Sequence, residues 1–265
     1  MIEVAAANSN VTRLRRLQRR RIARENECSI VVEGVKGVSD ALKAQRVESI
    51  FLRADDGAAV LALLGDVDAS IPVYALDTKT FAAVASTVAP QAAMAIVAWR
   101  PAAIDDIDFE RGAAIVLDGV ADPGNVGTIV RIADAAGACA VFAGPRTVDV
   151  TSAKVVRSAA GSLLRVPVVT SPTTVEAITE LRARSVRCVG AVAHGGLAYD
   201  AFDWSLPVAL VMGNEAHGID DAVAAALDGE VYVDMAPGAE SLNVAMACAV
   251  LAFEIRRQRM KGSAA

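Results

Sequence analysis

The sequence predicts an α/β fold with two domains, and its composition and the order of its elements both point that way. Apolar residues make up 54% of the 265-residue chain and aromatic residues only 4%. A composition this rich in Ala and Val suits a parallel sheet covered by helices. Strand-like and helix-like stretches alternate along most of the chain, which is the order typical of parallel α/β sheets. The length is sufficient for two modest domains.

The first hundred residues have the pattern of a smaller α/β unit. Strands are expected at 29–34, 47–53, 71–76 and 92–99, and helices at 37–46, 57–66 and 78–86. Residues 100–113 are acidic and have no clear period, so the domain linker is expected there. The predicted domains are therefore residues 1–103 and residues 104–265.

The second half begins a new series of the same kind. Strands are expected at 114–119, 138–144, 165–170, 187–193, 207–213 and 229–235. Helices are expected at 125–136, 151–163 and 173–184, with a short one from Ile219 and a long apolar one over 241–260. Strands that alternate with helices predict a parallel sheet in this domain.

Charge is distributed unevenly along the chain. The formal net charge is −5, yet residues 11–24 (VTRLRRLQRRRIAR) contain seven arginines and no acid. We call residues 11–24 the basic segment. An acidic body with a concentrated basic segment favours contact with a polyanion, and the alternative is a solvated helix face.

Several classes of protein are disfavoured by the sequence. No apolar run reaches 18 residues, so no membrane span is expected, and the N-terminus lacks the apolar core of a secretory signal. The cysteines are far apart in apolar contexts, which predicts reduced core residues in a cytoplasmic protein: Cys28, Cys139, Cys188 and Cys248. With only two histidines beside them, no metal site is expected.

The stretch LDGVADPGNVGTIVRIADAAG, residues 117–137, joins a buried strand to a helix through a turn at Asp122. Asn125 suits the N-cap of that helix. Arg131 lies off its apolar face. It either pairs with Asp134 on the surface or places a cation at the carboxyl edge of the sheet, where such sheets bind ligands; this stretch alone leaves both open.

The stretch LVMGNEAHGID, residues 210–220, places an acid directly after a buried strand. Glu215 is either an ordinary turn residue or a residue in the ligand position of a parallel sheet. His217 has the setting of an exposed turn residue.

The stretch ESLNVAMACAVL, residues 240–251, opens the terminal helix. Ser241 is a natural N-cap, which explains it without any further role. Asn243 is expected in the first turn of a helix that is apolar nearly all round, and a buried asparagine needs hydrogen-bond partners.

Together, and in this order, the three stretches resemble the motifs of the SpoU (TrmH-like) branch of the SPOUT methyltransferases. The family's N-P-G-N-x-G-x-x-x-R is Asp122 to Arg131 here, its G-x-E-x-x-G is Gly213 to Gly218, and its I-P-M…S-L-N-V is Val233-Asp234-Met235…Ser241 to Val244. The match covers about 114–260, and KVVRSAAGSLLRVPV (154–168) resembles the family's R-x-S-x-G…P-V segment. Asp122 replaces the usual Asn, and Asp234 replaces the usual Pro, which fixes φ where Asp does not.

The first hundred residues resemble the N-terminal RNA-binding domain that accompanies this family, which is similar in fold to a ribosomal protein of the large subunit. The residues that carry this likeness are VVEGVKGVSDAL and STVAPQAAMAIV. The usual P-Q-G is Pro90-Gln91-Ala92 here.

The resemblance implies a C-terminal parallel-sheet domain with a deep trefoil knot, an arrangement otherwise nearly absent from proteins. It also implies a homodimer and an S-adenosylmethionine pocket inside the knot. The residues carried over to that pocket are Ala193, Gly213, Val233, Met235 and Leu242. The implied reaction is methyl transfer to a ribose 2′-hydroxyl of RNA, and the separate N-terminal domain favours 23S ribosomal RNA.

The polar residues carried over to the reaction site are Asn125, Arg131, Glu215, Ser241 and Asn243. A guanidinium has a pKa above about 12. We therefore expect Arg131 to hold a phosphate and stabilise a developing alkoxide rather than act as a base. The expected RNA contacts are arginines of the basic segment: Arg13, Arg16, Arg20 and Arg24.

Three other functions were weighed. A tRNA ribose methyltransferase of the same superfamily fits the same motifs. A non-catalytic RNA-binding factor for ribosome assembly fits the charge pattern, but the intact polar residues of the motifs argue against it. A dinucleotide-dependent dehydrogenase is disfavoured, because no G-x-G-x-x-G follows a strand.

Overall fold

The computed structural model describes residues 1–238 and 241–262. Contacts divide the chain into two compact units. Unit 1 comprises Met1–Arg100 with Thr151–Leu164, and unit 2 comprises Pro101–Val150 with Arg165–Ala265. The sequence predicted residues 104–265 as one domain, whereas Thr151–Leu164 packs with unit 1 in the structure.

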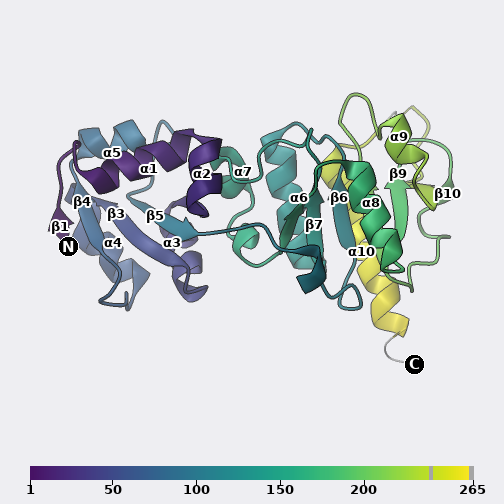
Figure 1. Ribbon diagram of the computed structural model, residues 1–265, viewed down its shortest axis with the longest axis horizontal. Helices are drawn as coiled ribbons and strands as arrows, with labels where there is room; N and C mark the ends of the chain where they lie inside the picture. The colour runs from purple at the N-terminus through teal and green to yellow at the C-terminus, as the bar shows by residue number, and fades with distance from the viewer. Residues whose placement is uncertain (239–240, 263–265) are drawn as a thin grey trace. The chain divides into compact units, whose positions relative to one another are not determined.

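Unit 1 is a five-stranded sheet with helices on both faces. Its strands are β1 (Ile2–Glu3), β2 (Ser29–Glu33), β3 (Val47–Arg53), β4 (Val73–Leu76) and β5 (Ala93–Ala98), in the order β1-β4-β3-β5-β2. Its helices are α1 (Ser9–Arg19), α2 (Arg21–Glu27), α3 (Val35–Lys43), α4 (Gly57–Leu64), α5 (Thr78–Val84) and α7 (Ala153–Ser158), with 3₁₀ turns at Ala54–Asp56 and Ser162–Leu164. Figure 1 shows α1 and α5 on one face of this sheet and α3 and α4 on the other.

The sheet of unit 1 is mixed. Strand β5 runs antiparallel to both of its neighbours, β2 and β3, whereas the β3–β4 and β1–β4 pairs are parallel. Alternation of strands and helices had favoured a parallel arrangement. The apolar residues of β5 have the same spacing in either direction, so the sequence pattern does not fix the direction of this strand.

The basic segment is folded onto the sheet of unit 1. Helix α1 buries Val11, Leu14 and Leu17 completely, in a core shared with Phe51 and Met94. Apolar residues three positions apart form one helix face, which leaves the arginines of α1 on the remaining surface. The segment is therefore an amphipathic pair of helices, α1 and α2, and not an extended arm.

Unit 2 is a seven-stranded sheet in which every pairing is parallel, as predicted. Its strands are β6 (Ala114–Leu117), β7 (Ala140–Ala143), β8 (Val168–Thr170), β9 (Arg187–Ala191), β10 (Leu197–Ala198), β11 (Val208–Met212) and β12 (Gly229–Tyr232), in the order β10-β12-β9-β11-β6-β7-β8. Its helices are α6 (Pro123–Ala136), α8 (Thr174–Ala183), α9 (Asp221–Ala224) and α10 (Val244–Gly262), with a 3₁₀ turn at Ile104–Asp106.

The strand order of unit 2 brings several loops to one edge. Strand β11 lies between β9 and β6, and β12 lies beside β9. Because these strands are parallel, the segments that follow β6, β9, β11 and β12 meet at the same carboxyl edge, where open α/β sheets bind ligands. Helix α10 packs against α6 and β11, which brings the start of α10 to this edge as well.

Two of the four cysteines lie in the core as predicted, and Cys139 is half-buried. Cys188 and Cys248 are buried, and burial raises the pKa of each thiol to about 12. Cys28, expected in the core, is exposed, because it ends α2 in the left-handed conformation with φ of 48°. Within the described part of the chain, no helix is both long and apolar enough to cross a membrane.

Candidate active site

The N-cap of helix α6 lies three residues before the predicted cap, and the helix itself begins two residues earlier than predicted. Asp122 is its N-cap, with Oδ1 accepting a hydrogen bond from the backbone N–H of Asn125 at 2.9 Å. Pro123 takes the first helical position, where its missing N–H costs nothing. The prediction that Asn125 caps the helix is wrong, because Asn125 lies inside the helix and its backbone N–H is bonded to the cap residue Asp122. The side chain of Asn125 is thereby left for other partners.

The N-cap of helix α10 lies two residues after the predicted cap, and the helix begins at Val244 rather than at 241. Asn243 is its N-cap, with Oδ1 accepting from the N–H groups of Ala245 at 2.9 Å and Met246 at 3.4 Å. The prediction that Ser241 is the cap is wrong, since the chain turns into the helix only at Val244. Asn243 is exposed rather than buried, so its amide nitrogen faces the space before the helix.

Glu215 is presented by a tight turn after β11. A Cβ added to Gly213 would lie 2.4 Å from the carbonyl carbon of Gly218, so no side chain is tolerated there. Asn214 and Gly218 exchange two backbone hydrogen bonds, at 2.8 and 2.9 Å, and Gly218 has φ of +71°, which favours glycine. The turn closes within five residues and fixes the direction of Glu215.

A chain of hydrogen bonds joins the three sequence motifs. The side-chain amide Nδ2 of Asn125 donates to Glu215 Oε1 at 2.8 Å. Asn243 Nδ2 donates to Asn125 Oδ1 at 3.0 Å. Because a carboxylate only accepts, it fixes which end of the Asn125 amide faces Glu215, and that orientation fixes the amide of Asn243 in turn. The carboxylate of Glu215 thus orients Asn125, which is 90 positions away in the sequence, and through it Asn243, which is 118 positions from Asn125.

Glu215 is ionised at neutral pH. Partial burial raises its pKa, but the hydrogen bonds that the carboxylate accepts outweigh burial and leave the pKa below the ordinary value of 4.5. The donors besides Asn125 are the backbone N–H groups of Ala121, at 3.1 Å, and Asp122, at 3.2 Å. Donors to the charged form stabilise it. Glu215 is therefore an anchoring anion and a poor base.

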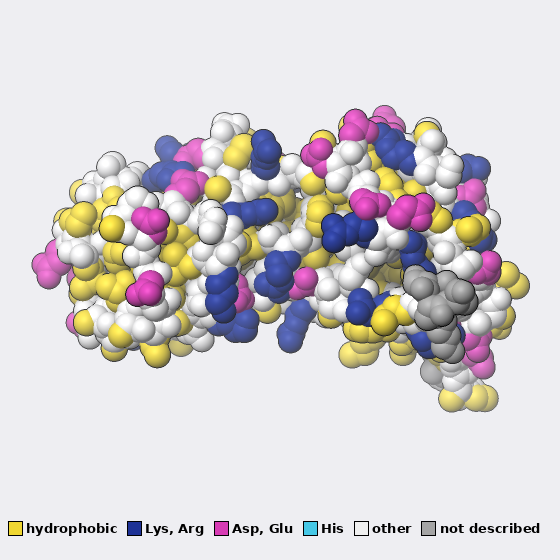
Figure 2. Space-filling view, turned by 90° about the horizontal axis from the view of Figure 1, so that it is seen from below, with side chains coloured by type: hydrophobic (Ala, Val, Ile, Leu, Met, Phe, Trp, Pro, Cys, Tyr) yellow, Lys and Arg dark blue, Asp and Glu magenta, His cyan; other side chains and the backbone are white. Residues whose placement is uncertain are grey.

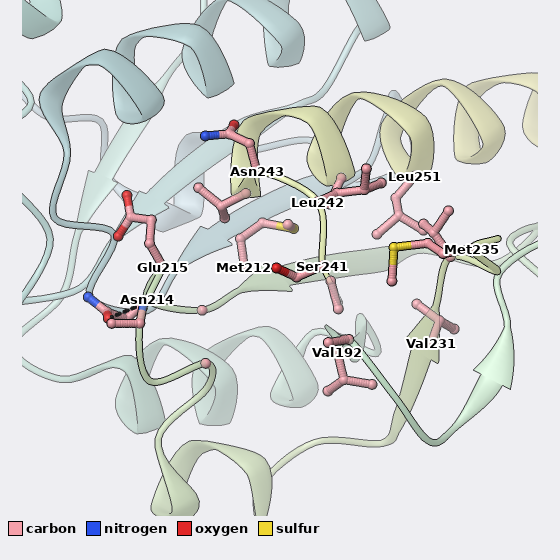
Figure 3. Close-up of a pocket in the computed structure, with 18 residues that line it drawn as sticks. Val192, Met212, Asn214, Glu215, Val231, Met235, Ser241, Leu242, Asn243 and Leu251 are labelled. Atoms are coloured by element: carbon pink, nitrogen blue, oxygen red, sulfur yellow. Dashed lines mark hydrogen bonds between the residues drawn. The ribbon is translucent and has the colours of Figure 1, made fainter. Parts of the chain in front are cut away.

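The chain of hydrogen bonds borders a cavity of about 470 Å³. The cavity is lined by residues that follow β9, β11 and β12 and by the start of α10. All five residues predicted to bind the cofactor line it: Ala193, Gly213, Val233, Met235 and Leu242. Figure 3 shows Glu215 and Asn243 near one end and Val231, Met235 and Leu251 near the other, so the cavity has a polar and an apolar end. Glu215, Ser241 and Asn243 also line the cavity. Asn125 does not line it, but it is hydrogen-bonded to two residues that do, Glu215 and Asn243.

A buried carboxylate that the sequence reasoning missed supports this edge. Asp118 follows β6 with 1% of its surface exposed. It accepts hydrogen bonds from Thr174 Oγ1 at 2.8 Å, the backbone N–H of Asp220 at 2.9 Å and Arg146 Nη2 at 3.2 Å. Arg146 Nη1 also donates to Asp220 Oδ2 at 2.8 Å. A lone acid that ends an apolar strand was the available signal, since a buried charge needs partners.

Comparison with known proteins finds family matches in both halves of the chain. The SpoU rRNA Methylase family model matches residues 112–253, and the model of the MRM3-like substrate binding domain matches residues 8–95. The chain belongs to the SpoU rRNA methylase family. A relative from Bacillus subtilis, named 23S rRNA (guanosine(2553)-2′-O)-methyltransferase RlmP, is 35% identical over 86% of this chain and 88% of its own length.

Solved structures resemble both units of this SpoU-family chain. The SpoU methyltransferase AviRb from Streptomyces viridochromogenes, in complex with AdoMet, has a TM-score of 0.86 at 28% identity, over 96% of this chain and 98% of that chain. An AdoMet-bound rRNA methyltransferase from Sinorhizobium meliloti has a TM-score of 0.83 at 30% identity, over 96% and 97% of the two chains.

Arg131 of the SpoU motif lies outside the cavity. It is exposed on α6 and does not line the cavity of its own chain. Its expected partner Asp134 bonds instead to Arg165, whose Nε and Nη2 donate at 2.9 and 2.6 Å. The hydrogen-bonded chain of Asn125, Glu215 and Asn243 therefore does not include Arg131.

Three of the four arginines predicted to bind RNA have partners inside unit 1. Arg13 is ion-paired with Glu27 and Glu48, at 2.6 and 2.7 Å, and Arg16 is paired with Glu27. Arg24 is buried with 7% exposed. Its Nη1 donates to the Leu17 carbonyl at 2.7 Å, and its Nε donates to Thr151 Oγ1 at 2.9 Å.

These contacts change the set of candidate RNA contacts. The burial of Arg24 argues against its predicted role, whereas Arg20 is exposed. Arg15 and Arg19 belong to the same seven arginines, and spacing alone did not show which of the seven have acidic partners. Both units show basic and acidic side chains on the face in Figure 2. The described residues contain no group of three or more His, Cys, Asp or Glu that could hold a metal ion.

Proposed function

We propose that this chain transfers a methyl group from S-adenosylmethionine to a ribose 2′-hydroxyl of 23S ribosomal RNA. The observation that carries the proposal is the chain Glu215–Asn125–Asn243, which aligns two amides at the rim of the cavity. The name of the Bacillus subtilis relative specifies the same reaction. The match of unit 1 to a substrate-binding domain supports a large RNA substrate.

The cavity fits S-adenosylmethionine in size and chemistry. A volume of about 470 Å³ is within the usual range for cofactor pockets. Its lining combines an apolar end with polar groups at the other end, and Glu215 alone is charged among the described lining residues. Ala193, Gly213, Val233, Met235 and Leu242 would hold the cofactor, largely through their backbone. When bound, it supplies an activated methyl group, because its sulfonium leaves as a neutral thioether.

The polar residues of the chain orient the RNA hydroxyl. Glu215 uses one of the two amide hydrogens of Asn125, and Asn125 uses one of those of Asn243. The second hydrogen of each amide is directed by this arrangement and can bind an oxygen of the substrate. Rigid alignment of a hydroxyl with a methyl group lowers the entropic part of the barrier. The low pKa of Glu215 excludes it as the base at neutral pH.

We assign Arg131 to a second copy of the chain. Helix α10 packs on α6 and leaves large apolar side chains on its surface, with 64% of Met246, 37% of Val250 and 47% of Phe253 exposed. An apolar helix face of this kind is typical of a protein interface. In the proposed homodimer, Arg131 of one protomer acts at the cavity of its partner, where its planar fork holds a phosphate and stabilises the developing alkoxide.

The substrate class is tested by offering the purified chain labelled S-adenosylmethionine with either total tRNA or protein-free large-subunit RNA. We expect label in the large-subunit RNA and little in tRNA. Transfer to tRNA alone would support the alternative of a tRNA ribose methyltransferase. Tight cofactor binding without transfer to either RNA would support a non-catalytic assembly factor.

Three expectations from the resemblance belong to this proposal. The trefoil knot stays a prediction. A cytoplasmic location is proposed because a ribosomal RNA methyltransferase works where ribosomes are assembled. Asp234, which is exposed between Val233 and Met235 at the cavity, stays a candidate for altering the cofactor loop, because it lacks the fixed φ of proline.

A further inference from the structure

The arginines of α1 lie on two flanks of the helix. Val11, Leu14 and Leu17 face the core, and Arg13 and Arg16 lie on the flank that faces Glu27. Arg15 and Arg19, one turn apart, lie on the other flank. Neither has a carboxylate partner within the described residues, and Arg19 Nη2 donates only to the carbonyl of Ala83, at 3.3 Å.

The loop after α5, residues 86–91, lies beside this second flank. The backbone N–H of Ser86 donates to Glu33 Oε1 at 2.8 Å, and Gln18 of α1 donates to the same oxygen. Val88 of the loop is fully exposed. The contacts through Glu33 and Ala83 therefore place Arg19 beside the start of this exposed loop, and Arg15 lies one helical turn before Arg19 on the same flank.

The segment Thr151–Leu164 supplies a third guanidinium to the same loop. Although it lies inside the part of the chain that matches the SpoU methylase model, it packs with unit 1. Helix α7 lies against β2, and Trp99 Nε1 donates to the Leu163 carbonyl at 3.3 Å. Arg157 donates to Ser86 Oγ. Arg157 belongs to the R-x-S-x-G stretch, to which the proposed reaction gives no role.

We propose that Arg15 and Arg19 on α1, together with Arg157 at the loop 86–91, form a phosphate-binding surface for the RNA substrate. Two arginines one turn apart on a helix repel each other. When RNA binds, its phosphates neutralise both charges and attract both side chains. The planar fork of arginine matches the geometry of phosphate. This inference rests on the proposed function and gives part of the methylase sequence a role in RNA binding.

The test measures the affinity of the full chain for protein-free large-subunit ribosomal RNA at several salt concentrations between about 50 and 200 mM. The triple variant Arg15→Gln, Arg19→Gln, Arg157→Gln is compared with wild type. Loss of three phosphate contacts should reduce the slope of log affinity against log salt by roughly 2 to 3. Affinity for S-adenosylmethionine should stay unchanged, because the cavity residues are untouched. Lys43→Gln, on α3 at the opposite face of the sheet, is the matched control and should leave the slope unaltered.

An unchanged slope in a triple variant that melts at the wild-type temperature would overturn the phosphate-binding surface. An equal loss in Lys43→Gln would do the same, because it would show a non-specific charge effect. If the triple variant unfolds, Arg15→Gln with Arg19→Gln decides, since neither side chain is buried, with an expected slope reduction of roughly 1.5. A wild-type chain that methylates RNA while the variants keep their slope contradicts this surface alone. A wild-type chain that binds RNA with the predicted slopes but transfers no methyl group contradicts the proposed function alone.

Discussion

The two units differ in how their sheets present chemistry. In unit 2 every strand pair is parallel, so the ends of β6, β9, β11 and β12 meet at one edge and surround a cavity. In unit 1 the interior strand β5 is antiparallel to both of its neighbours, so the strand ends are divided between the two edges. Unit 1 instead presents guanidinium groups on helices. This difference in topology supports the proposal that unit 2 binds the small cofactor and unit 1 binds the RNA.

The units also differ in what holds their charged groups. Glu215 in unit 2 accepts three hydrogen bonds from uncharged donors, whereas Arg13 and Arg16 in unit 1 meet carboxylates. Hydrogen bonds from neutral groups are less sensitive to salt than ion pairs at the surface. Cofactor binding should therefore vary little with salt, and RNA binding should vary steeply.

The largest effect is expected at the aligned amides of unit 2. Asn125→Ala breaks the link between Glu215 and Asn243, and we expect methyl transfer to fall about 100-fold, the cost of misplacing a reacting group by about 1 Å. RNA affinity should be unchanged, because unit 1 is untouched. The measurement is single-turnover transfer, with Thr128→Ala on the same helix as the control. A change below about threefold would remove Asn125 from the reaction.

The second effect tests whether the active site is completed by a second copy of the chain. Arg131→Ala and Glu215→Ala are each expected to fall well below a quarter of wild-type activity, though by less than Asn125→Ala. Mixing them by joint refolding should restore about a quarter of wild-type activity, because half of the dimers are mixed and each of these has one intact site if Arg131 acts on the partner. Activity of a proven mixed dimer no higher than that of the single variants would place Arg131 at the cavity of its own chain.

The third effect is on stability. Asp118→Asn replaces a buried acceptor of three hydrogen bonds with an amide whose NH₂ group faces donors, and we expect the free energy of unfolding to fall by about 2 kcal/mol. Urea unfolding measures it, with the exposed Asp200→Asn as control. An equally small change in both variants would show that Asp118 does not hold the loops of unit 2.

The smallest effect is an expected absence of pH dependence. The pKa of Glu215 is lowered below 4.5, so its ionised form favours the native state above the unfolded pKa, and this contribution is lost only as pH falls through the folded pKa. Methyl transfer by wild type and Glu215→Gln should therefore have parallel pH profiles between about pH 5 and 8. A limb in that range present in wild type and missing in Glu215→Gln would show that Glu215 acts as a base.

The sequence predicted the parallel sheet of unit 2 and six of its seven strands, because their apolar runs are long and uninterrupted; it missed β10, which is only two residues long. It did not predict which residues cap α6 and α10. Asp122 and Asn125, like Ser241 and Asn243, have similar preferences for the cap, and the choice depends on where the chain leaves the cavity. Cap assignment therefore required the structure, and the roles of Asn125 and Asn243 changed with it.

Long-range contacts explain the rest of what the sequence did not show. The packing of Thr151–Leu164 on unit 1 depends on Trp99 and Arg24, which are far away in sequence. The same contacts bury Arg24, which composition had grouped with the exposed arginines. Charge counts predicted a basic surface, but only the positions of Glu27 and Glu48 showed which arginines are neutralised.

The most direct test of the central claim locates the transferred methyl group. Large-subunit RNA labelled by the purified chain is hydrolysed in alkali, which cleaves after every nucleotide except one whose 2′-oxygen is methylated. We predict that the label appears in alkali-resistant dinucleotides with wild type and falls to background with Asn125→Ala. Label in mononucleotides, which indicates base methylation, would contradict the assignment of the cavity of unit 2 to ribose 2′-O-methylation.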